Sequence, residues 1–433
     1  GSAVSVATGQ VCFSLGTDTA GSGRVPASFN NIIGLKGTKG RISCSGVVPA
    51  CQSLDCVTIF TSTAADAKAV WQVAGAFDPV DPFARAAVPS KAMLAAFTFG
   101  VPSPEQLAFF GDEAAEVLFW QSVETLKELG GEAVTINLDP FVQAAKLLYE
   151  GPYVAERLAA IKDFFREDPT RCLPVIQTIV GGAEKRAAVE AYEALYALQR
   201  YKRVTDAELA KVDFIVTPTA GTIYPIADVE ADPIQLNSNL GHYTNFMNLL
   251  DYCAIAIPSG FRITGSKRGL PFGVTLFAAA FQDDALLAIA DLWQRKLDLP
   301  LGATGQEFPA NTPVVAQPTN GMIDVLVCGA HLSGLPLNWQ LTDRKAFLKQ
   351  VTETAKAYRM YALAGGPPYR PGLIRDTENG AAIAVEVWSV PTEHFGSFVA
   401  GIPAPLGIGK VELADGSWVS GFICEPCGLD GAE

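Results

Sequence analysis

Apolar residues in the first two thirds of the chain follow two spacings, one typical of buried strands and one typical of helices with a single apolar face. Short apolar runs predict strands in VCFSL, AAFTFGVPS, AVTINL, DFIVTPT, IAIPSG and GVTLFAA. Apolar residues three and four positions apart predict helices over 63–76, 112–130, 140–165, 183–211 and 282–297. Because strands alternate with helices, the pattern predicts an α/β domain with one mixed sheet flanked by helices over residues 1–298.

The pattern changes after residue 298. Residues 299–321 are rich in Pro, Gly, Asn, Thr and Gln and have no clear periodicity, which is typical of a linker. Residues 322–433 contain strand-like runs separated by turn signals, with one helical pattern over 343–358. We therefore predict that residues 322–433 form a separate, mainly β, α+β domain.

The amino-acid composition indicates which kinds of binding partner this protein has. The chain of 433 residues is 49% hydrophobic and 18% charged, which predicts a globular protein of two or three domains. A net charge of −13 argues against a nucleic-acid partner, which would need a basic face. We also expect no membrane contact and no signal peptide, because no apolar run reaches about 18 residues and residues 1–15 lack a basic lead. The long helical pattern over 183–211 offers a surface for a homodimer.

Nine cysteines are scattered along the chain without a regular spacing. An odd number without such a framework predicts reduced thiols and a cytoplasmic location. A lone C-x-x-C, from Cys424 to Cys427, has no second pair and no nearby histidine. We therefore expect no metal there, with zinc binding or redox chemistry as the alternative. We expect no cofactor elsewhere in the chain.

A glycine-rich stretch over residues 16–27 reads GTDTAGSGRVPA and surrounds Ser22 with glycines at Gly16, Gly21 and Gly23. Glycines lack a Cβ atom, so the backbone can turn sharply and bring several N–H groups close to a ligand. Acyl transfer needs a hydroxyl nucleophile beside backbone donors for a developing oxyanion. An isolated serine in such a turn is usually an ordinary surface residue, but the extended pattern favours an acyl-transfer site.

This stretch, followed by NNIIGLKGTKG, resembles the amidase signature family. The resemblance continues in DFIVTPT, NLLDYCAIAIPSG and GLPFGVTLFA, and so covers residues 1–297. Within that family, VVPACQSLDCVTIF and the attached C-terminal domain resemble the allophanate hydrolases. In the C-terminal domain, CGAHLSGLPLN and AVEVWSVP resemble the γ-glutamylcyclotransferase-like fold, which implies a β-barrel there.

The resemblance implies an amidohydrolase acting on linear amides. Such an enzyme would hydrolyse the small molecule allophanate to ammonia and carbon dioxide, through a Ser–cis-Ser–Lys mechanism, in urea degradation and nitrogen metabolism. Two alternatives stay open. The chain could be an amidase for another small substrate, such as biuret or a carboxamide, or a catalytically incomplete fragment that serves in assembly.

Carried over to this sequence, the resemblance makes Ser22 the acyl-accepting nucleophile. Asp18 and Arg24 are expected to hold the loop around it through charge-assisted hydrogen bonds. The backbone N–H groups that the resemblance assigns to the oxyanion hole are those of Thr19, Ala20, Gly21 and Ser22.

The other two members of the family's triad are expected at positions before Gly1, so this chain is expected to carry one of the three. Lys36 and Lys39 follow the nucleophile in the wrong part of the motif, and we predict structural roles for both. Asp55, in SLD before an apolar run, could cap a helix or pin a loop.

Substrate recognition is predicted at Tyr149 and Arg157, which flank a break in the helical pattern at Gly151-Pro152. The resemblance implies that this tyrosine and arginine bind the carboxylate of allophanate. An arginine suits that task because its planar guanidinium matches a carboxylate in a bidentate manner. The alternative is an ordinary arginine on a helix surface.

Two residues of the C-terminal domain are candidates for a second step. His331, on a glycine-flanked loop after a predicted strand, would transfer protons as an N-carboxycarbamate-type intermediate is processed. Glu386, inside an apolar strand, is the matching carboxylate because burial raises a carboxyl pKa. Either residue could equally be structural. The other two histidines, His242 and His394, are predicted to be surface or packing residues.

Overall fold

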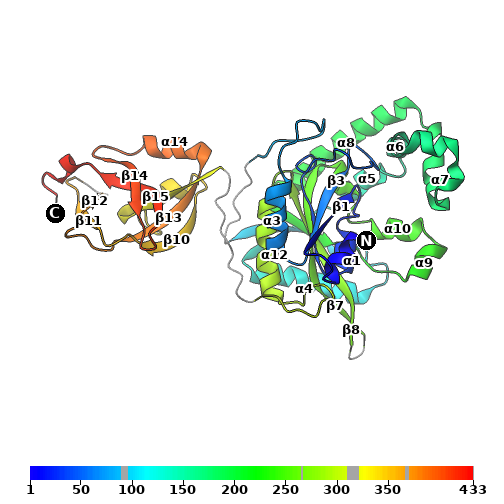
Figure 1. The fold of residues 1–433 in the computed structure, drawn as a ribbon, viewed down its shortest axis with the longest axis horizontal. Helices are drawn as coiled ribbons and strands as arrows, with labels where there is room; N and C mark the ends of the chain where they lie inside the picture. The colour runs from blue at the N-terminus through cyan, green and yellow to red at the C-terminus, as the bar shows by residue number, and fades with distance from the viewer. Residues whose placement is uncertain (89–95, 265–266, 310–320, 366–369, 433) are drawn as a thin grey trace. The chain divides into compact units, whose positions relative to one another are not determined.

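The computed structural model describes residues 1–88, 96–264, 267–309, 321–365 and 370–432 (Figure 1). Its contacts divide the chain into two compact units, Gly1–Val314, called unit 1, and Val315–Glu433, called unit 2. Of the predicted linker, residues 310–320 lie outside the described residues, whereas residues 299–309 belong to unit 1. There the Ala303 N–H donates to the Ala7 carbonyl over 2.7 Å, so this segment packs on the first helix of the chain.

Unit 1 is built on one mixed sheet of eight strands in the order β1-β3-β2-β7-β8-β6-β4-β5. β4 pairs in parallel with β5 and β6, and the remaining neighbours pair antiparallel. This confirms the predicted α/β class. The strands are β1 (Phe13–Asp18), β2 (Ile33–Lys36), β3 (Cys56–Thr61), β4 (Phe97–Pro102), β5 (Gly131–Ile136), β6 (Phe214–Pro218), β7 (Tyr252–Thr264) and β8 (Lys267–Ala279).

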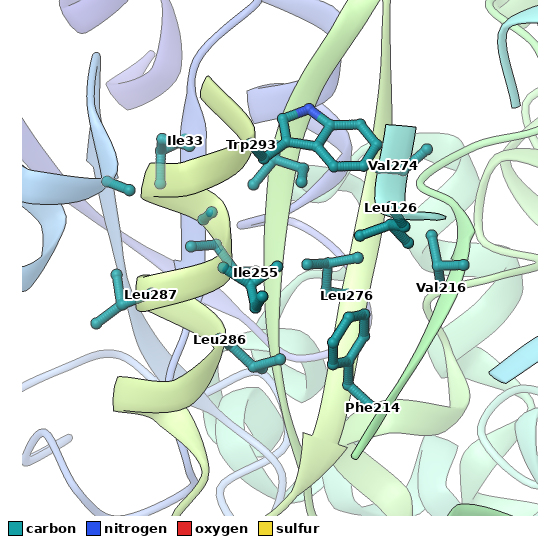
Figure 2. Packing of buried hydrophobic residues seen from close by; sticks show 14 of the residues in the cluster. Ile33, Leu126, Phe214, Val216, Ile255, Val274, Leu276, Leu286, Leu287 and Trp293 are labelled. Carbon is teal, nitrogen blue, oxygen red and sulfur yellow. The ribbon is translucent and has the colours of Figure 1, made fainter. Parts of the chain in front are cut away.

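Alternating side chains of the central strands feed two apolar clusters on opposite faces of the sheet. In β8, for example, Leu276 belongs to one cluster and Phe277 to the other. Figure 2 shows the first cluster, in which Leu286, Leu287 and Trp293 of α12 face the sheet. The helices over this face are α3 (Ala64–Ala74), α4 (Glu113–Glu128) and α12 (Asp283–Leu297).

The second cluster includes residues of α5, α8 and α11. The predicted break at Gly151-Pro152 separates α5 from α6, which begins at Tyr153. Among the described residues, no helix has the length and hydropathy that crossing a membrane requires. The other helices of unit 1 are α1 (Ser2–Ala7), α2 (Val25–Phe29), α5 (Asp139–Lys146), α6 (Tyr153–Glu167), α7 (Pro174–Gly181), α8 (Ala188–Leu209), α9 (Ile226–Ala231), α10 (Gln235–Leu240) and α11 (Phe246–Leu249), with short 3₁₀ turns at Pro104–Gln106, Pro169–Arg171 and Ala183–Lys185.

Unit 2 contains a five-stranded sheet in the order β10-β13-β9-β15-β14 and a two-stranded sheet of β11 and β12. β15 and β9 pair in parallel, and the other pairs are antiparallel. The strands are β9 (Met322–Val327), β10 (Phe347–Glu353), β11 (Tyr358–Ala362), β12 (Pro371–Arg375), β13 (Ala384–Pro391), β14 (Leu406–Glu412) and β15 (Trp418–Cys424). The helices are α13 (Trp339–Thr342) and α14 (Thr392–Ala400), with 3₁₀ turns η4 (Gly329–His331) and η5 (Pro426–Leu429).

Two expectations for unit 2 are wrong. The predicted helix over 343–358 is instead β10 followed by the start of β11, because β10 pairs along its length with β13 and Lys345 turns the chain with a φ of 58°. The predicted β-barrel is not closed. In the described part of unit 2, β10 and β14 are the two edge strands of the larger sheet. Directly after these strands, Thr354 and Leu413 form an isolated β-bridge, but the two strands do not pair along their length.

Candidate active site

The serine loop, Asp18 to Arg24, joins the end of β1 to the start of α2. β1 pairs with β3 along its whole length, which fixes the point where the loop begins. The Ser22 side chain is exposed, although its neighbours Gly21 and Gly23 are buried. The loop therefore presents one hydroxyl at the surface of an otherwise buried turn.

A buried ion pair closes the serine loop. The Arg24 guanidinium donates from Nε to Asp18 Oδ2 over 2.8 Å and from Nη2 to Oδ1 over 2.9 Å, and both side chains are fully buried. The same carboxylate accepts the N–H of Gly21 over 2.8 Å and the N–H of Gly23 over 3.2 Å. Asp18 thus binds the side chain at one end of the loop and two backbone groups in its middle. The predicted loop-supporting residues lie together.

The Asp18 carboxylate is ionised at neutral pH. Burial alone would raise its pKa, but the charge and hydrogen bonds of Arg24, together with the nearby Lys36 charge, hold the pKa below its ordinary value. Charge-assisted bonds of this kind are about twice as strong as neutral ones. The loop conformation therefore depends on a charged pair that water does not reach.

Two positions of the loop require glycine. Gly21 has a φ of 144°, and a Cβ atom there would lie 2.3 Å from Thr244 Oγ1. A Cβ atom on Gly23 would lie 2.2 Å from the side chain of Thr58. The absence of these two side chains lets the turn lie against β3 and the segment before α11, leaving room for Ser22 at the surface.

The four predicted oxyanion donors differ in their availability. The Gly21 N–H already donates to Asp18. Within the part of the chain that the structure describes, the N–H groups of Ala20 and Ser22 have no acceptor in the protein. Thr19 is held by its hydroxyl, which donates to the buried Asp55 carboxylate. The loop therefore offers unused backbone donors beside the Ser22 hydroxyl, which is the arrangement that an oxyanion requires.

In the described part of the chain, neither downstream lysine forms a hydrogen bond with the Ser22 hydroxyl. Lys36 is fully buried in β2, and its Nζ donates to the Tyr252 carbonyl over 2.5 Å. Lys39 donates to the Ser53 carbonyl over 3.3 Å, and burial lowers the pKa of its amine. Among the described residues the Ser22 hydroxyl has no hydrogen-bond partner.

The predicted carboxylate-binding pair lies at the break between α5 and α6. Arg157 Nη2 donates to the Tyr149 hydroxyl over 3.3 Å, and the guanidinium carbon lies 5.0 Å from the centroid of the tyrosine ring. Within the described residues, the buried Arg157 Nε has no hydrogen-bond partner. Tyr149 is 42% exposed. The Arg157 guanidinium therefore has further N–H groups that could donate hydrogen bonds to a carboxylate.

In unit 2, His331 lies in η4 and contacts Gln340, with 3.0 Å between Nε2 and Oε1. Its ring stacks on Phe422 at 5.0 Å between centroids, and burial lowers its pKa, so it is neutral at pH 7. Glu386 lies in β13, buried, and its Oε2 accepts from the N–H and hydroxyl of Ser333 and from the Trp388 indole over 2.8–3.0 Å.

The two candidates therefore lie near each other in the chain's fold, because Glu386 binds Ser333, which follows His331 of η4 by two residues. No hydrogen bond joins the His331 and Glu386 side chains to each other in the described residues. Of the remaining histidines, His242 packs edge-on against Tyr243 and His394 lies 3.7 Å from Glu393. The nine cysteines are free thiols, and no group of acidic, cysteine or histidine side chains in the described residues could hold a metal ion.

Residues 241–250 supply partners that the sequence did not point to. The Thr244 carbonyl and Asn248 Oδ1 each accept from the Arg24 guanidinium over 3.2 Å. Asn248 also donates to the Asp18 carbonyl over 2.7 Å. These residues lie more than two hundred positions from the loop. Asn248 opens NLLDYCAIAIPSG, one of the stretches that carry the family resemblance, but that stretch did not indicate contacts with Asp18 and Arg24.

Comparison with known proteins gives matches over the whole chain. The family model described as Amidase matches residues 1–287, and the model described as Allophanate hydrolase C-terminal domain matches residues 323–433. A urea amidolyase of Saccharomyces cerevisiae is 41% identical over 443 residues, which are 99% of this chain and 24% of that protein. A urea amidolyase of Lachancea kluyveri is 40% identical, also with 24% of its length covered. The chain thus spans about a quarter of the length of these curated relatives.

Comparison with solved structures also gives an allophanate hydrolase and an amidase as similar proteins. The allophanate hydrolase of Kluyveromyces lactis superposes with a TM-score of 0.82 and 38% identity, covering 100% of this chain and 72% of that one. The crystal structure of an amidase superposes with a TM-score of 0.55 at 24% identity, covering 67% of this chain and 64% of that one, which shows a shared fold.

Proposed function

The chain belongs to the amidase family, and from this premise we propose that it hydrolyses allophanate to ammonia and carbon dioxide. The observation that carries the proposal is the exposed Ser22 hydroxyl beside unused backbone N–H groups, on a loop held by the buried Asp18–Arg24 pair. The likeness of the whole chain to the Kluyveromyces lactis allophanate hydrolase supports the choice of substrate.

In the first step, Ser22 Oγ attacks the carbamoyl carbon of allophanate. The carbonyl oxygen gains negative charge, which the N–H groups of Ala20 and Ser22 stabilise, and the bond from that carbon to the terminal nitrogen then breaks. Ammonia leaves with the serine proton, and the acyl group stays on Oγ. Water hydrolyses this ester, which releases N-carboxycarbamate and restores the serine. Removal of one oxyanion donor typically costs about 10²–10³ in rate.

Arg157 and Tyr149 hold the substrate carboxylate. Two observations support this role. The hydrogen bond from Arg157 to the Tyr149 hydroxyl is weak, at 3.3 Å, and Arg157 Nε has no partner among the described residues. A carboxylate placed beside Tyr149 would accept a hydrogen bond from the Arg157 guanidinium in place of this weak bond. The same site would bind biuret poorly, because biuret carries a neutral carboxamide where allophanate carries the charge.

A second step is assigned to unit 2. N-carboxycarbamate loses carbon dioxide when the bond between its nitrogen and one carboxyl carbon breaks and the nitrogen takes a proton. We assign the relay of that proton to the neutral His331, which accepts the proton of the departing carboxyl group on one ring nitrogen and passes a proton to the substrate nitrogen from the other. Glu386 holds the segment after η4 through Ser333. His331→Ala should then leave the rate of the first ammonia release unchanged and slow the release of carbon dioxide. Both rates are measured by detecting the two products in the same reaction. Equal rates of carbon dioxide release in the two proteins would contradict the assignment.

We also propose a cytoplasmic homodimer. Free thiols favour a reducing compartment. Val189, Tyr192 and Tyr196 of α8 are each about 60% exposed and stand three to four positions apart, which gives the helix an apolar outer face. Tyr192→Glu should dissociate the dimer in sedimentation velocity, whereas an unchanged mass would place the interface elsewhere.

The nucleophile is tested by ammonia release from allophanate, using the complete natural polypeptide that carries these residues. Ser22→Ala should lose at least about 10³-fold in kcat. The matched control is Ser238→Ala, an exposed serine on α10 whose hydroxyl donates to the Ile234 carbonyl of its own helix, and it should keep wild-type turnover. Ser22→Ala with more than a tenth of wild-type turnover would overturn the proposal, and no turnover by the wild type would favour a role in assembly.

Substrate choice is tested by comparing allophanate with biuret. Arg157→Gln should lower kcat/KM for allophanate about 10- to 150-fold, the value of a hydrogen bond to a charged group, and should spare biuret. Arg166→Gln is the control, because Arg166 lies on the same helix but pairs with Glu184 at the surface. Equal kcat/KM values for Arg157→Gln and wild type on allophanate would favour an amidase with another small substrate.

A further inference from the structure

A short segment, Ala50 to Asp55, lies between the serine loop and α6, and we call it the bridge segment. Its last residue, Asp55, is buried and accepts three hydrogen bonds. Two come from the backbone of the segment itself, from Ala50 N–H over 2.8 Å and Cys51 N–H over 3.2 Å. The third comes from the Thr19 hydroxyl of the serine loop. One carboxylate therefore folds the bridge segment and binds the loop that carries Ser22.

The bridge segment is also bonded to α6. Ser53 donates its N–H to Glu156 Oε1 over 2.7 Å and its hydroxyl to Glu156 Oε2 over 2.8 Å. Both carboxylate oxygens of Glu156 are thus bound to one residue of the segment. Glu156 lies in the first turn of α6 and directly precedes Arg157.

A third bond fixes the bridge segment against the serine loop. Asn248 is fully buried, and its Nδ2 donates to the carbonyls of Asp18 over 2.7 Å and Leu54 over 3.0 Å. One amide therefore binds the first residue of the serine loop and the penultimate residue of the bridge segment. The spacing between these two segments is set by a side chain that neither of them supplies.

We propose that the bridge segment sets the distance between Ser22 and the carboxylate-binding pair, with Asp55 and Glu156 as positioning residues. Asp55 orients the serine loop through Thr19, and Glu156 orients the start of α6 and hence Arg157. This inference rests on the proposed function. Under it, the length of the segment selects a small acid, whose carboxylate reaches Arg157 while its carbonyl reaches Ser22, over longer amides.

Two substitutions separate the two ends of the bridge segment. Asp55→Asn weakens the bond to Thr19 with little change of shape, so kcat should fall about 10-fold for allophanate and biuret alike, with KM nearly unchanged. Glu156→Gln weakens the hold on α6, so KM for allophanate should rise about 10-fold while kcat changes little. Glu124→Gln is the control, because among the described residues the Glu124 carboxylate forms an exposed pair with Lys127 on α4 and no other ion pair.

The bond between Thr19 and Asp55 is tested by a double-mutant cycle. Thr19→Val should lower kcat more than Thr19→Ser, which keeps the hydroxyl. Asp55→Asn combined with Thr19→Val should lose no more than the larger single loss, because the two variants remove one interaction. A purely structural role would instead lower the amount of folded enzyme by the same factor as kcat, which titration of Ser22 with a covalent inhibitor measures.

Two kinetic results would overturn the proposal. One is a wild-type kcat for Asp55→Asn, and the other is a loss of biuret turnover in Glu156→Gln as large as that of allophanate. Either result leaves the proposed function standing if Ser22→Ala remains inactive.

Hydrogen exchange supplies a test that does not depend on turnover. If the wild type does not hydrolyse allophanate, the proposed function fails, but the inference is still testable in this way. Asp55→Asn should speed exchange of the hydrogen-bonded amides of Gly21, Gly23 and Arg24 at least about 10-fold and leave those of α12 unchanged. Unchanged exchange at these three amides would overturn the inference.

Discussion

Two arginines of unit 1 carry the same guanidinium and are used in opposite ways. Arg24 is fully buried, and its donors bond to Asp18, to the Thr244 carbonyl and to Asn248. Arg157 makes one hydrogen bond, of 3.3 Å, and its Nε has no partner among the described residues. A guanidinium has five N–H donors. An arginine whose donors the protein already binds is part of the scaffold, whereas one with spare donors can bind a ligand.

The comparison predicts its largest effect on stability at Arg24. Arg24→Met leaves the buried Asp18 carboxylate without its ion-pair partner, so the free energy of unfolding should fall by about 3–5 kcal/mol. Arg157→Met should change it by less than about 1 kcal/mol, because that side chain is partly exposed and has one weak bond. Hydrogen exchange of the β1 and α2 amides measures the change in unit 1 separately from unit 2. Equal losses in both variants would break the comparison.

A smaller loss is expected where the scaffold needs glycine. Gly21→Ala places a Cβ atom against Thr244 at a φ of 144°, which should cost about 1–3 kcal/mol and displace Ser22. Gly182→Ala is the control, because a Cβ there has nothing within 4 Å and φ is −75°. The control should be neutral or slightly stabilising. Urea unfolding followed by circular dichroism measures both, and equal stability of Gly21→Ala and wild type would argue against a tightly built loop.

The pH dependence of the buried pair should be visible in acid. The folded state holds the pKa of Asp18 below its value of about 3.9 in the unfolded chain. Its stabilising contribution is therefore complete above about pH 4 and is lost as pH falls through the depressed folded pKa. The stability difference between wild type and Asp18→Asn should be constant from pH 5 to 7 and shrink below about pH 4. A difference that shrinks between pH 5 and 7 would contradict the cited direction of the shift.

The difference between the two units also shows what sequence alone could predict. Unit 1 strands and helices differ clearly in their apolar spacing, and the α/β class is confirmed. In unit 2 the residues of β10 carry apolar positions that also fit a helix, and the pairing with β13, more than thirty residues away, decides the outcome. Local spacing does not contain that information.

The residues of the candidate site also fall into those that one local motif indicated and those that it did not. Asp18, Ser22 and Arg24 stand within seven residues, so their association was visible in one motif. Asn248 joins them from 230 positions away, and Asp55 joins Thr19 from 36 positions away. Such partners depend on how the sheet brings β1, β3 and the segment before β7 together, which no local pattern encodes.

The central claim is that Ser22 carries the acyl group during turnover. The direct measurement is to mix the complete natural polypeptide with allophanate, quench in acid within milliseconds, and locate the adduct by peptide mass spectrometry. We predict an acyl adduct on Ser22 of the wild type that disappears in Ser22→Ala together with ammonia release. An adduct on another residue, or turnover by Ser22→Ala, would contradict it.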